Sequence, residues 1–245
     1  MTAADPGWLL RAWERGSTAA PAARGAVLCA AAGVTPTLDA ALDLSLDVLA
    51  ATLARMYRDE FGSSASGTLT CEVCTQVLDI EVPLGLLADN GPSRRETVLT
   101  TPSGRVVRLR VPTTRDVLDA ADRDDAADRD DVVAALVERC VVDADLARLA
   151  EPLGGDDLAA VDAELEALAG AAAVSVSSVC PSCGAELSAP VDVADFVWER
   201  VQQQAPDLLA DIADLARAFG WTEDVILGLS PQRRGSYLAL VREDA

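Results

Sequence analysis

The chain has 245 residues, half of them hydrophobic, and a formal net charge of −20 from 40 acidic and 20 basic residues. This length and hydrophobic content allow one or two folded domains and exclude disorder throughout. The charge disfavours nucleic-acid binding, because a phosphate backbone requires a basic surface. Histidine is absent, which removes the commonest general base and the His-containing catalytic zinc sites. We therefore expect no enzyme activity and no small-molecule substrate.

The sequence also lacks the signals of export and of membrane insertion. The first residues carry no basic segment followed by an apolar one, as a signal peptide would. No apolar run approaches the roughly 18 residues that a membrane span needs. All basic residues are arginine, a bias typical of GC-rich bacterial genomes. We expect a soluble, cytoplasmic bacterial protein with no membrane partner.

The first 66 residues are predicted to be helical. Apolar periodicity and turn residues indicate helices over residues 6–16, 21–32 and 38–61, with Thr37 capping the third. One inward-facing stripe of the third helix comprises Leu42, Leu46, Leu49, Leu53, Met56 and Tyr57. Residues 62–67 are rich in Gly and Ser and predict a flexible joint.

Two Cys-x-x-Cys motifs, far apart in the chain, carry the clearest chemical signal. Each follows a β-like approach and precedes an alternating strand, over residues 76–82 and 185–191. Two such turns supply four thiolates, the ligand set of a tetrahedral structural zinc site. We predict that one Zn²⁺ is bound by Cys71, Cys74, Cys180 and Cys183.

Two other interpretations of these cysteines stay open. A redox dithiol is disfavoured because a thioredoxin-like motif opens a helix, whereas a strand follows each pair here. Structural disulfides are typical of secreted proteins, and nothing marks this chain as secreted. Cys29 and Cys140 are interpreted as small core residues rather than as further ligands.

The stretch between the two motifs must itself fold. A hairpin is predicted from strands 97–101 and 105–111, followed by a helix from Arg115 that Thr114 caps. Further helices over 132–141 and 158–168 precede a strand over 174–178. Two acidic hexads, 120–125 and 126–131, lack the central Gly and terminal Glu of a calcium loop. They are interpreted as a solvated acidic face.

The C-terminal segment reads as a series of helices. Asp192 is expected to cap the first, Pro206 to kink or restart it and Gly220 to end it. Thr222 would cap a short helix over 223–227, and a last helix would start at Ser230. Apolar residues here form either a local core or a docking surface for a partner, with partner contacts assigned to Phe219, Trp221, Ile226 and Tyr237.

Together these elements predict an α+β fold. It consists of a zinc-ribbon-like β unit, split by a long mixed insertion, between helical N-terminal and C-terminal segments. The predicted divisions are residues 1–66, residues 67–191 with the insertion at about 83–173, and residues 192–245.

Short motifs in a fixed order point to a family. They are Arg108–Asp116 (RLRVPTTRD), Arg139-Cys140-Val141, Cys180–Gly184 (CPSCG), Asp195–Glu199 (DFVWE), Leu215–Glu223 (LARAFGWTE), Ile226–Arg234 (ILGLSPQRR) and Tyr237-Leu238. This pattern resembles the baseplate hub assembly chaperone family of contractile-tailed, T-even-like phages and related phage-tail-like particles. The resemblance covers most of residues 67–245, and the acidic hexads depart from it.

The resemblance implies a non-catalytic assembly factor or minor structural component whose partners are baseplate or hub proteins. It also implies that the protein acts in the cytoplasm or within a phage-tail-like particle. A zinc-ribbon transcription or nucleic-acid-binding regulator is the alternative, which the acidic charge disfavours. A redox or metal-dependent enzyme is a third class, disfavoured because a four-thiolate zinc has no open coordination position.

Overall fold

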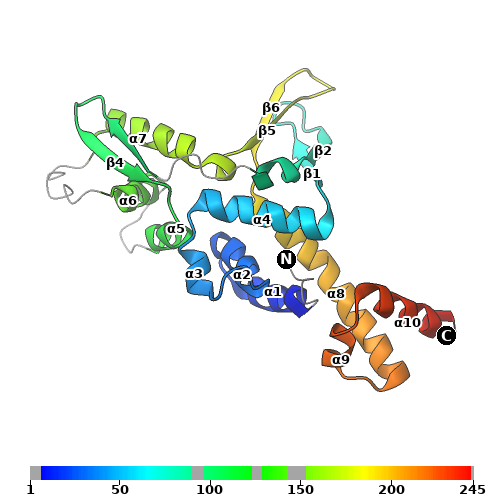
Figure 1. The fold of residues 1–245 in the computed structure, drawn as a ribbon. Coiled ribbons are helices and arrows are strands. Elements are labelled where there is room, and N and C mark those ends of the chain that lie inside the picture. The colour runs from blue at the N-terminus through cyan, green and yellow to red at the C-terminus, as the bar shows by residue number, and fades with distance from the viewer. Residues whose placement is uncertain (1–6, 90–95, 123–128, 143–152, 244–245) are drawn as a thin grey trace.

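A computed structural model describes residues 7–89, 96–122, 129–142 and 153–243. The fold is α+β, as predicted, and these residues form helices and three small antiparallel sheets of two strands each. Figure 1 shows a central helical body from which three parts extend: a pair of β-hairpins, an insertion lobe and the C-terminal helices. Among the residues with described structure, none of the helices combines the length and apolar character needed to cross a membrane.

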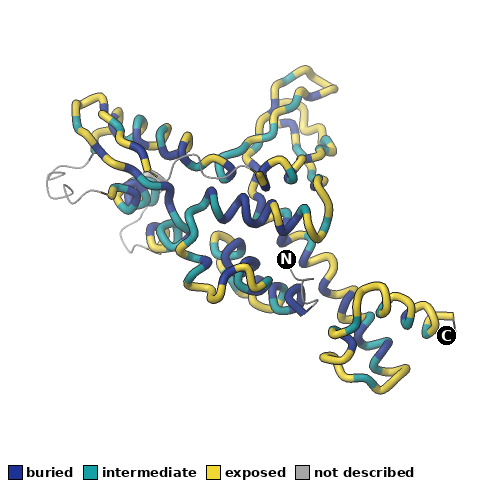
Figure 2. The backbone as a smooth tube through the Cα atoms, in the orientation of Figure 1, coloured by how far each residue is buried: buried dark blue, intermediate teal, exposed yellow. Residues whose placement is uncertain are grey.

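The helical body is built around α4, which is buried on most of its surface (Figure 2). Its elements are α1 (Gly7–Thr18), η1 (Pro21–Ala23), α2 (Arg24–Ala31), α3 (Leu38–Leu42), α4 (Leu46–Phe61), η2 (Leu84–Asp89) and the first half of α8 (Val193–Phe219). One hydrophobic core joins them. This core therefore combines helices from both terminal segments of the chain.

The prediction of one helix over residues 38–61 is wrong, because the chain breaks between α3 and α4. Ser45 is extended and forms an isolated β-bridge with Thr113. The Leu46 N–H donates to the Pro112 carbonyl at 2.9 Å. These contacts start α4 against the insertion lobe.

The paired hairpins are two antiparallel units that the sequence places far apart. The first comprises β1 (Ala65–Thr70) and β2 (Val77–Val82), and the second β5 (Ser175–Val179) and β6 (Glu186–Pro190). The predicted flexible joint at residues 62–67 is wrong from Ala65 onward, because Ala65 is buried and pairs with Val82. Burial of this end of the hairpin in the main core fixes the strand.

The insertion lobe has a separate hydrophobic core. Its elements are β3 (Glu96–Thr100), β4 (Val106–Arg110), α5 (Thr114–Ala121), α6 (Arg129–Cys140) and α7 (Gly155–Leu168). The short η4 (Gly170–Ala172) that follows returns to the body and packs on α4. The predicted hairpin is confirmed to within one residue. The two acidic hexads meet within residues 123–128, which lie outside the described residues.

The helix after β4 begins one residue earlier than predicted. Thr113, not Thr114, caps α5: its hydroxyl oxygen accepts from the Asp116 N–H, and the Asp116 carboxylate accepts from the Thr113 N–H in return. This reciprocal capping box satisfies two N–H groups that the helix would otherwise leave unpaired.

The C-terminal helices project from the body. α8 is continuous through Pro206 and ends at Gly220, whose φ of 67° lies in the left-handed region. Its N-terminus is capped as predicted, by the Asp192 carboxylate accepting from the Ala194 N–H at 2.8 Å. α9 (Glu223–Leu227) and α10 (Pro231–Glu243) fold back on its second half. Thr222 precedes α9 without a side-chain capping bond.

Candidate metal centre

Each Cys-x-x-Cys motif forms the turn of one hairpin. In the first turn, the Cys71 N–H donates to the Gln76 carbonyl at 2.8 Å and the Thr75 N–H donates to the Cys71 carbonyl at 2.8 Å. The second turn repeats both bonds, from Cys180 to Ala185 at 2.8 Å and from Gly184 to Cys180 at 2.9 Å. The two turns thus share one backbone design.

The residue after the second cysteine of each turn has a positive φ. It is 75° at Gly184 and 60° at Thr75. Glycine adopts this left-handed conformation freely, whereas a β-branched residue is strained in it. Because threonine disfavours a positive φ, the conformation of the first turn must be imposed by the rest of the hairpin and not by Thr75 itself.

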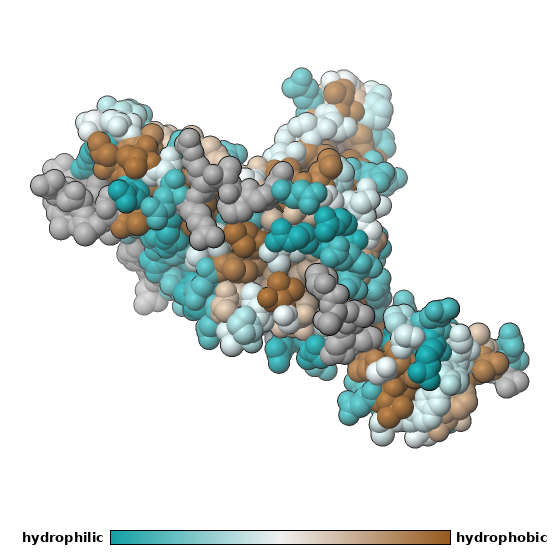
Figure 3. Space-filling model, viewed as in Figure 1, coloured by the Kyte–Doolittle hydropathy of each residue, from teal (hydrophilic) through white to brown (hydrophobic). Residues whose placement is uncertain are grey.

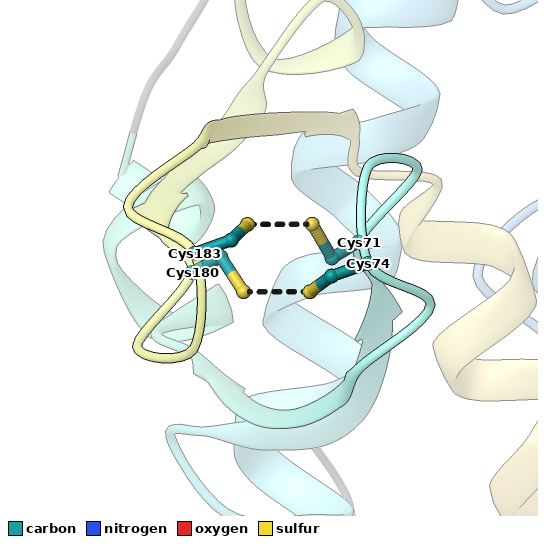
Figure 4. A group of neighbouring side chains, drawn as sticks. All are labelled: Cys71, Cys74, Cys180 and Cys183. Carbon is teal, nitrogen blue, oxygen red and sulfur yellow. Dashed lines mark hydrogen bonds between the residues drawn. The ribbon is translucent and has the colours of Figure 1, made fainter.

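The two turns face each other, so that all four sulfurs point into one space (Figure 4). The Sγ atoms of Cys71 and Cys183 lie 3.7 Å apart, and those of Cys74 and Cys180 lie 3.5 Å apart. All four lie within 4.8 Å of one another. Four sulfurs bound tetrahedrally at about 2.3 Å from one ion would lie about 3.8 Å apart. The spacing therefore fits a metal ion held by four cysteines.

The same distances bear on the alternatives. A disulfide needs sulfurs about 2.05 Å apart, and all six cysteines are free. Cys29 and Cys140 are fully buried in the main core and the lobe core, which confirms that they are core residues. Burial raises the pKa of each of these two thiols to about 12.

Backbone N–H groups point at the cluster sulfurs, a contact that the sequence did not reveal. Burial raises the pKa of Cys180, but hydrogen bonds from the N–H groups of Cys183 and Ser182 and from neighbouring thiols outweigh it. The pKa of Cys180 falls to about 7 as a result. The Cys74 sulfur accepts from the Gln76 N–H, and the Cys183 sulfur from the Ala185 N–H. Such bonds stabilise thiolate, the form that binds metal. The backbone bonds lower the pKa of Cys74 and Cys183, but burial and hydrogen bonds to the neighbouring thiols raise it further, so the net pKa of both is raised, to about 12 at Cys74.

The centre lies at the surface, with little hydrophobic support. Cys71 and Cys180 are buried, whereas Cys74 and Cys183 are exposed. Among the described residues, Leu187 is the buried apolar neighbour of this small cluster, with Leu69, Leu78 and Ala185 partly buried against it. Four protein ligands leave a tetrahedral ion no position for water or substrate. The arrangement is suited to holding the two hairpins together.

The residues assigned to partner contacts lie in the C-terminal segment, away from the cysteines: three are on helices and Trp221 is in the connection between α8 and α9. Phe219 stacks on Trp221 with ring centroids 4.7 Å apart, and Tyr237 meets Trp221 edge-on at 4.9 Å. Phe219 is exposed and the other two rings are partly buried. Ile226 is fully buried, so its side chain supports this unit from within. On the face in Figure 3, hydrophobic atoms gather over these helices.

Comparison with protein-family models, curated proteins and solved structures finds no match to this chain.

Proposed function

We propose that the cysteine cluster binds one structural Zn²⁺ and that the paired hairpins form a zinc-ribbon-like unit. The sulfur spacing and the backbone N–H groups directed at the sulfurs support this assignment. Because the ligands come from both sides of the insertion, the ion closes the long excursion between residues 74 and 180, and its binding energy is in part folding energy.

Elemental analysis of freshly reduced, desalted protein tests the metal. We expect one zinc per chain, lost on Cys71→Ser. A tetrahedral four-sulfur site also suits iron, which would give a coloured protein and contradict the zinc assignment. Protein that carries neither metal, after purification without chelator, would refute the site altogether.

We further propose that the chain is a non-catalytic assembly factor, or a minor structural component, for the baseplate or hub of a contractile phage-tail-like particle. The observation that carries this proposal is the aromatic trio Phe219, Trp221 and Tyr237, which lies among the helices that project from the body. Clustered aromatic side chains at a surface are typical of binding sites. The acidic charge and the resemblance described above also support the proposal.

In this mechanism the protein holds a hub or baseplate protein until that protein is incorporated. The trio supplies apolar contact, and the negative surface accelerates the encounter with basic partners and favours them over acidic ones. No bond is made or broken at the metal, whose contribution is to keep the hairpins in place.

Co-purification with the hub and baseplate proteins encoded beside this gene tests the proposal. We expect a complex that Trp221→Ala weakens. The control Leu86→Ala, which removes a more exposed apolar side chain elsewhere, should leave it intact; Leu86 is 70% exposed. Circular dichroism of both variants checks that each is folded. If no neighbouring hub or baseplate protein associates with the wild type, the assembly role is refuted.

A further inference from the structure

A groove of about 300 Å³ opens between the two hairpins, on the side where α8 begins. Its hairpin walls are contributed by both halves of the split unit, including Ile80 and Val82 from β2 and Val176 from β5. Ile80 and Val176 are partly buried, whereas Val82 is buried at the inner end. The groove exists only because two segments distant in sequence lie side by side.

The floor of the groove is close-packed. The Phe196 ring of α8 lies against the backbone of Gly67 in β1, and a Cβ atom at Gly67 would come within 3.3 Å of that ring. Where β1 and α8 approach each other, the floor of the groove is apolar. The strands that line the groove direct every second side chain toward the same side. An extended chain would match this spacing.

The remaining wall of the groove is acidic. Asp192, Asp195 and Glu199 lie in the first turns of α8 at spacings of three and four residues, which puts them on one face of the helix. Of the ion pairs formed by described residues, none involves these three carboxylates. Burial, followed by repulsion from Asp192, raises the pKa of Asp195, and the nearby Arg24 offsets this only in part. A cation placed here would relieve this repulsion.

We propose that this groove binds a short extended segment of a partner protein in which arginine or lysine alternates with apolar residues. The apolar side chains would pack on Ile80, Val176 and Phe196, and the basic ones would pair with Asp195 and Glu199. Charge complementarity selects this occupant over an acidic or purely apolar segment. The inference deepens the proposed function and rests on it for the existence of a protein partner.

Fluorescence anisotropy with a labelled peptide of alternating valine and arginine tests the proposal on the full-length, metal-loaded chain. We expect saturable binding that weakens as salt is raised. A valine–glutamate peptide of equal length should not bind. Asp195→Asn combined with Glu199→Gln should weaken binding about five- to tenfold, because two exposed charge pairs are lost.

A matched control separates the groove from the overall charge. Asp207→Asn combined with Glu223→Gln makes the same change in net charge at exposed positions farther along the C-terminal helices. This control should bind the peptide as the wild type does. Hydrogen exchange should show slower exchange of the Thr68 and Val176 amides when peptide is added.

Absence of binding by the wild type, or equal weakening in the groove variant and the control, would overturn the proposal. Protection elsewhere, such as at Tyr237, would also overturn it. The measurement uses no hub or baseplate protein. A failed peptide test therefore refutes the groove as a binding site and does not affect the assembly role. A failed co-purification with a positive peptide test refutes the assembly role and supports the groove as a binding site.

Discussion

The helical body and the paired hairpins are stabilised by different means. In the body, α1, α2, α4 and α8 bury a large shared core that includes Tyr57, Leu53 and Trp198. The hairpins meet over Leu187 and the two buried cysteines. An isolated two-stranded hairpin is marginally stable at best, and one buried leucine contributes about 2 kcal/mol. The inner ends of the hairpins, such as Ala65 and Val82, still pack on the main core. The comparison suggests that at their outer ends the proposed metal site would take the place of a core.

The largest expected effect comes from removing one metal ligand. In Cys180→Ser, metal affinity should fall by more than the roughly 10- to 100-fold that loss of an outer-shell partner costs. The amides of β1, β2, β5 and β6 should then exchange rapidly with solvent, while those of α4 stay protected. Metal analysis and hydrogen exchange measure the two effects.

The buried Cys140, which lies in the lobe core, supplies the control. Cys140→Ala should lower stability without loss of metal. If the hairpin amides stay protected in metal-free Cys180→Ser, the hairpins have an independent source of stability and the comparison with the body fails.

The body should instead be most sensitive to a change in packing volume. A Cβ atom on Gly16 of α1 would overlap the ring of Trp198 on α8. Gly16→Ala should therefore lower the free energy of unfolding by about 1–3 kcal/mol, measured by urea denaturation. Gly235→Ala is the matched control, because that helical glycine has no atom within 4 Å of its added Cβ. It should stabilise α10 by up to about 1 kcal/mol. A neutral Gly16→Ala would show that α1 and α8 can separate.

The insertion lobe adds an ionic network to its own core. Arg110 donates to both carboxylate oxygens of Asp116, at 2.7 and 2.9 Å, and to the Arg139 carbonyl. Burial raises the pKa of Asp116, but the hydrogen bonds from Arg110 and Thr113 lower it further, so the net shift is downward. Asp116→Asn should cost about 1–2 kcal/mol through loss of the cap and the ion pair.

The lowered pKa also predicts the pH dependence of this network. The contribution of Asp116 is complete above its unfolded pKa of about 3.9 and is lost as the pH falls through the lower folded value. The protection factors of the α5 amides, which compare measured with intrinsic exchange rates, should thus fall on acidification below about pH 4 in the wild type. Asp116→Asn should lack this dependence; the same acid response in that variant would assign it to another group.

The smallest effect should come from the strained turn residue. Thr75→Gly removes a β-branched side chain from a left-handed conformation and should stabilise the first turn by up to about 1 kcal/mol. Gly184→Thr should destabilise the second turn by a similar amount. Competition for metal with a chelator compares the two. Equal affinities in both variants and the wild type would show that the turns do not limit metal binding.

Much of the fold follows from local patterns in the sequence. Helix periodicity, the Asp192 cap and the alternating strands predict the order of elements, because each depends on near neighbours. The break at Ser45 could not be predicted, since it depends on Thr113 in a different part of the chain. The start of β1 at Ala65 could not be predicted for the same reason, because its small residues look like a linker until they pair with β2.

The candidate site shows the same division. The identity of the four cysteines follows from their spacing, and the structure brings them together. The backbone donors at Gln76 and Ala185 carry no side-chain signal. The glycine in Cys-Pro-Ser-Cys-Gly indicates a turn with positive φ. The first motif has Thr75 at the same position, so its sequence does not indicate that the two turns share one conformation. The acidic wall of the groove could not be predicted from the sequence, because the groove forms only where the hairpins lie beside α8.

The length of α8 has a consequence for any partner that touches both of its ends. Its 27 residues, at about 1.5 Å each, make a rod of about 40 Å. The groove lies at one end of this rod and the aromatic trio at the other. A single partner can engage both only with two epitopes about that far apart. If both proposed sites bind one partner, α8 would set the distance between the two contacts. A partner of the right span would then gain avidity, and a shorter one would bind at either end alone.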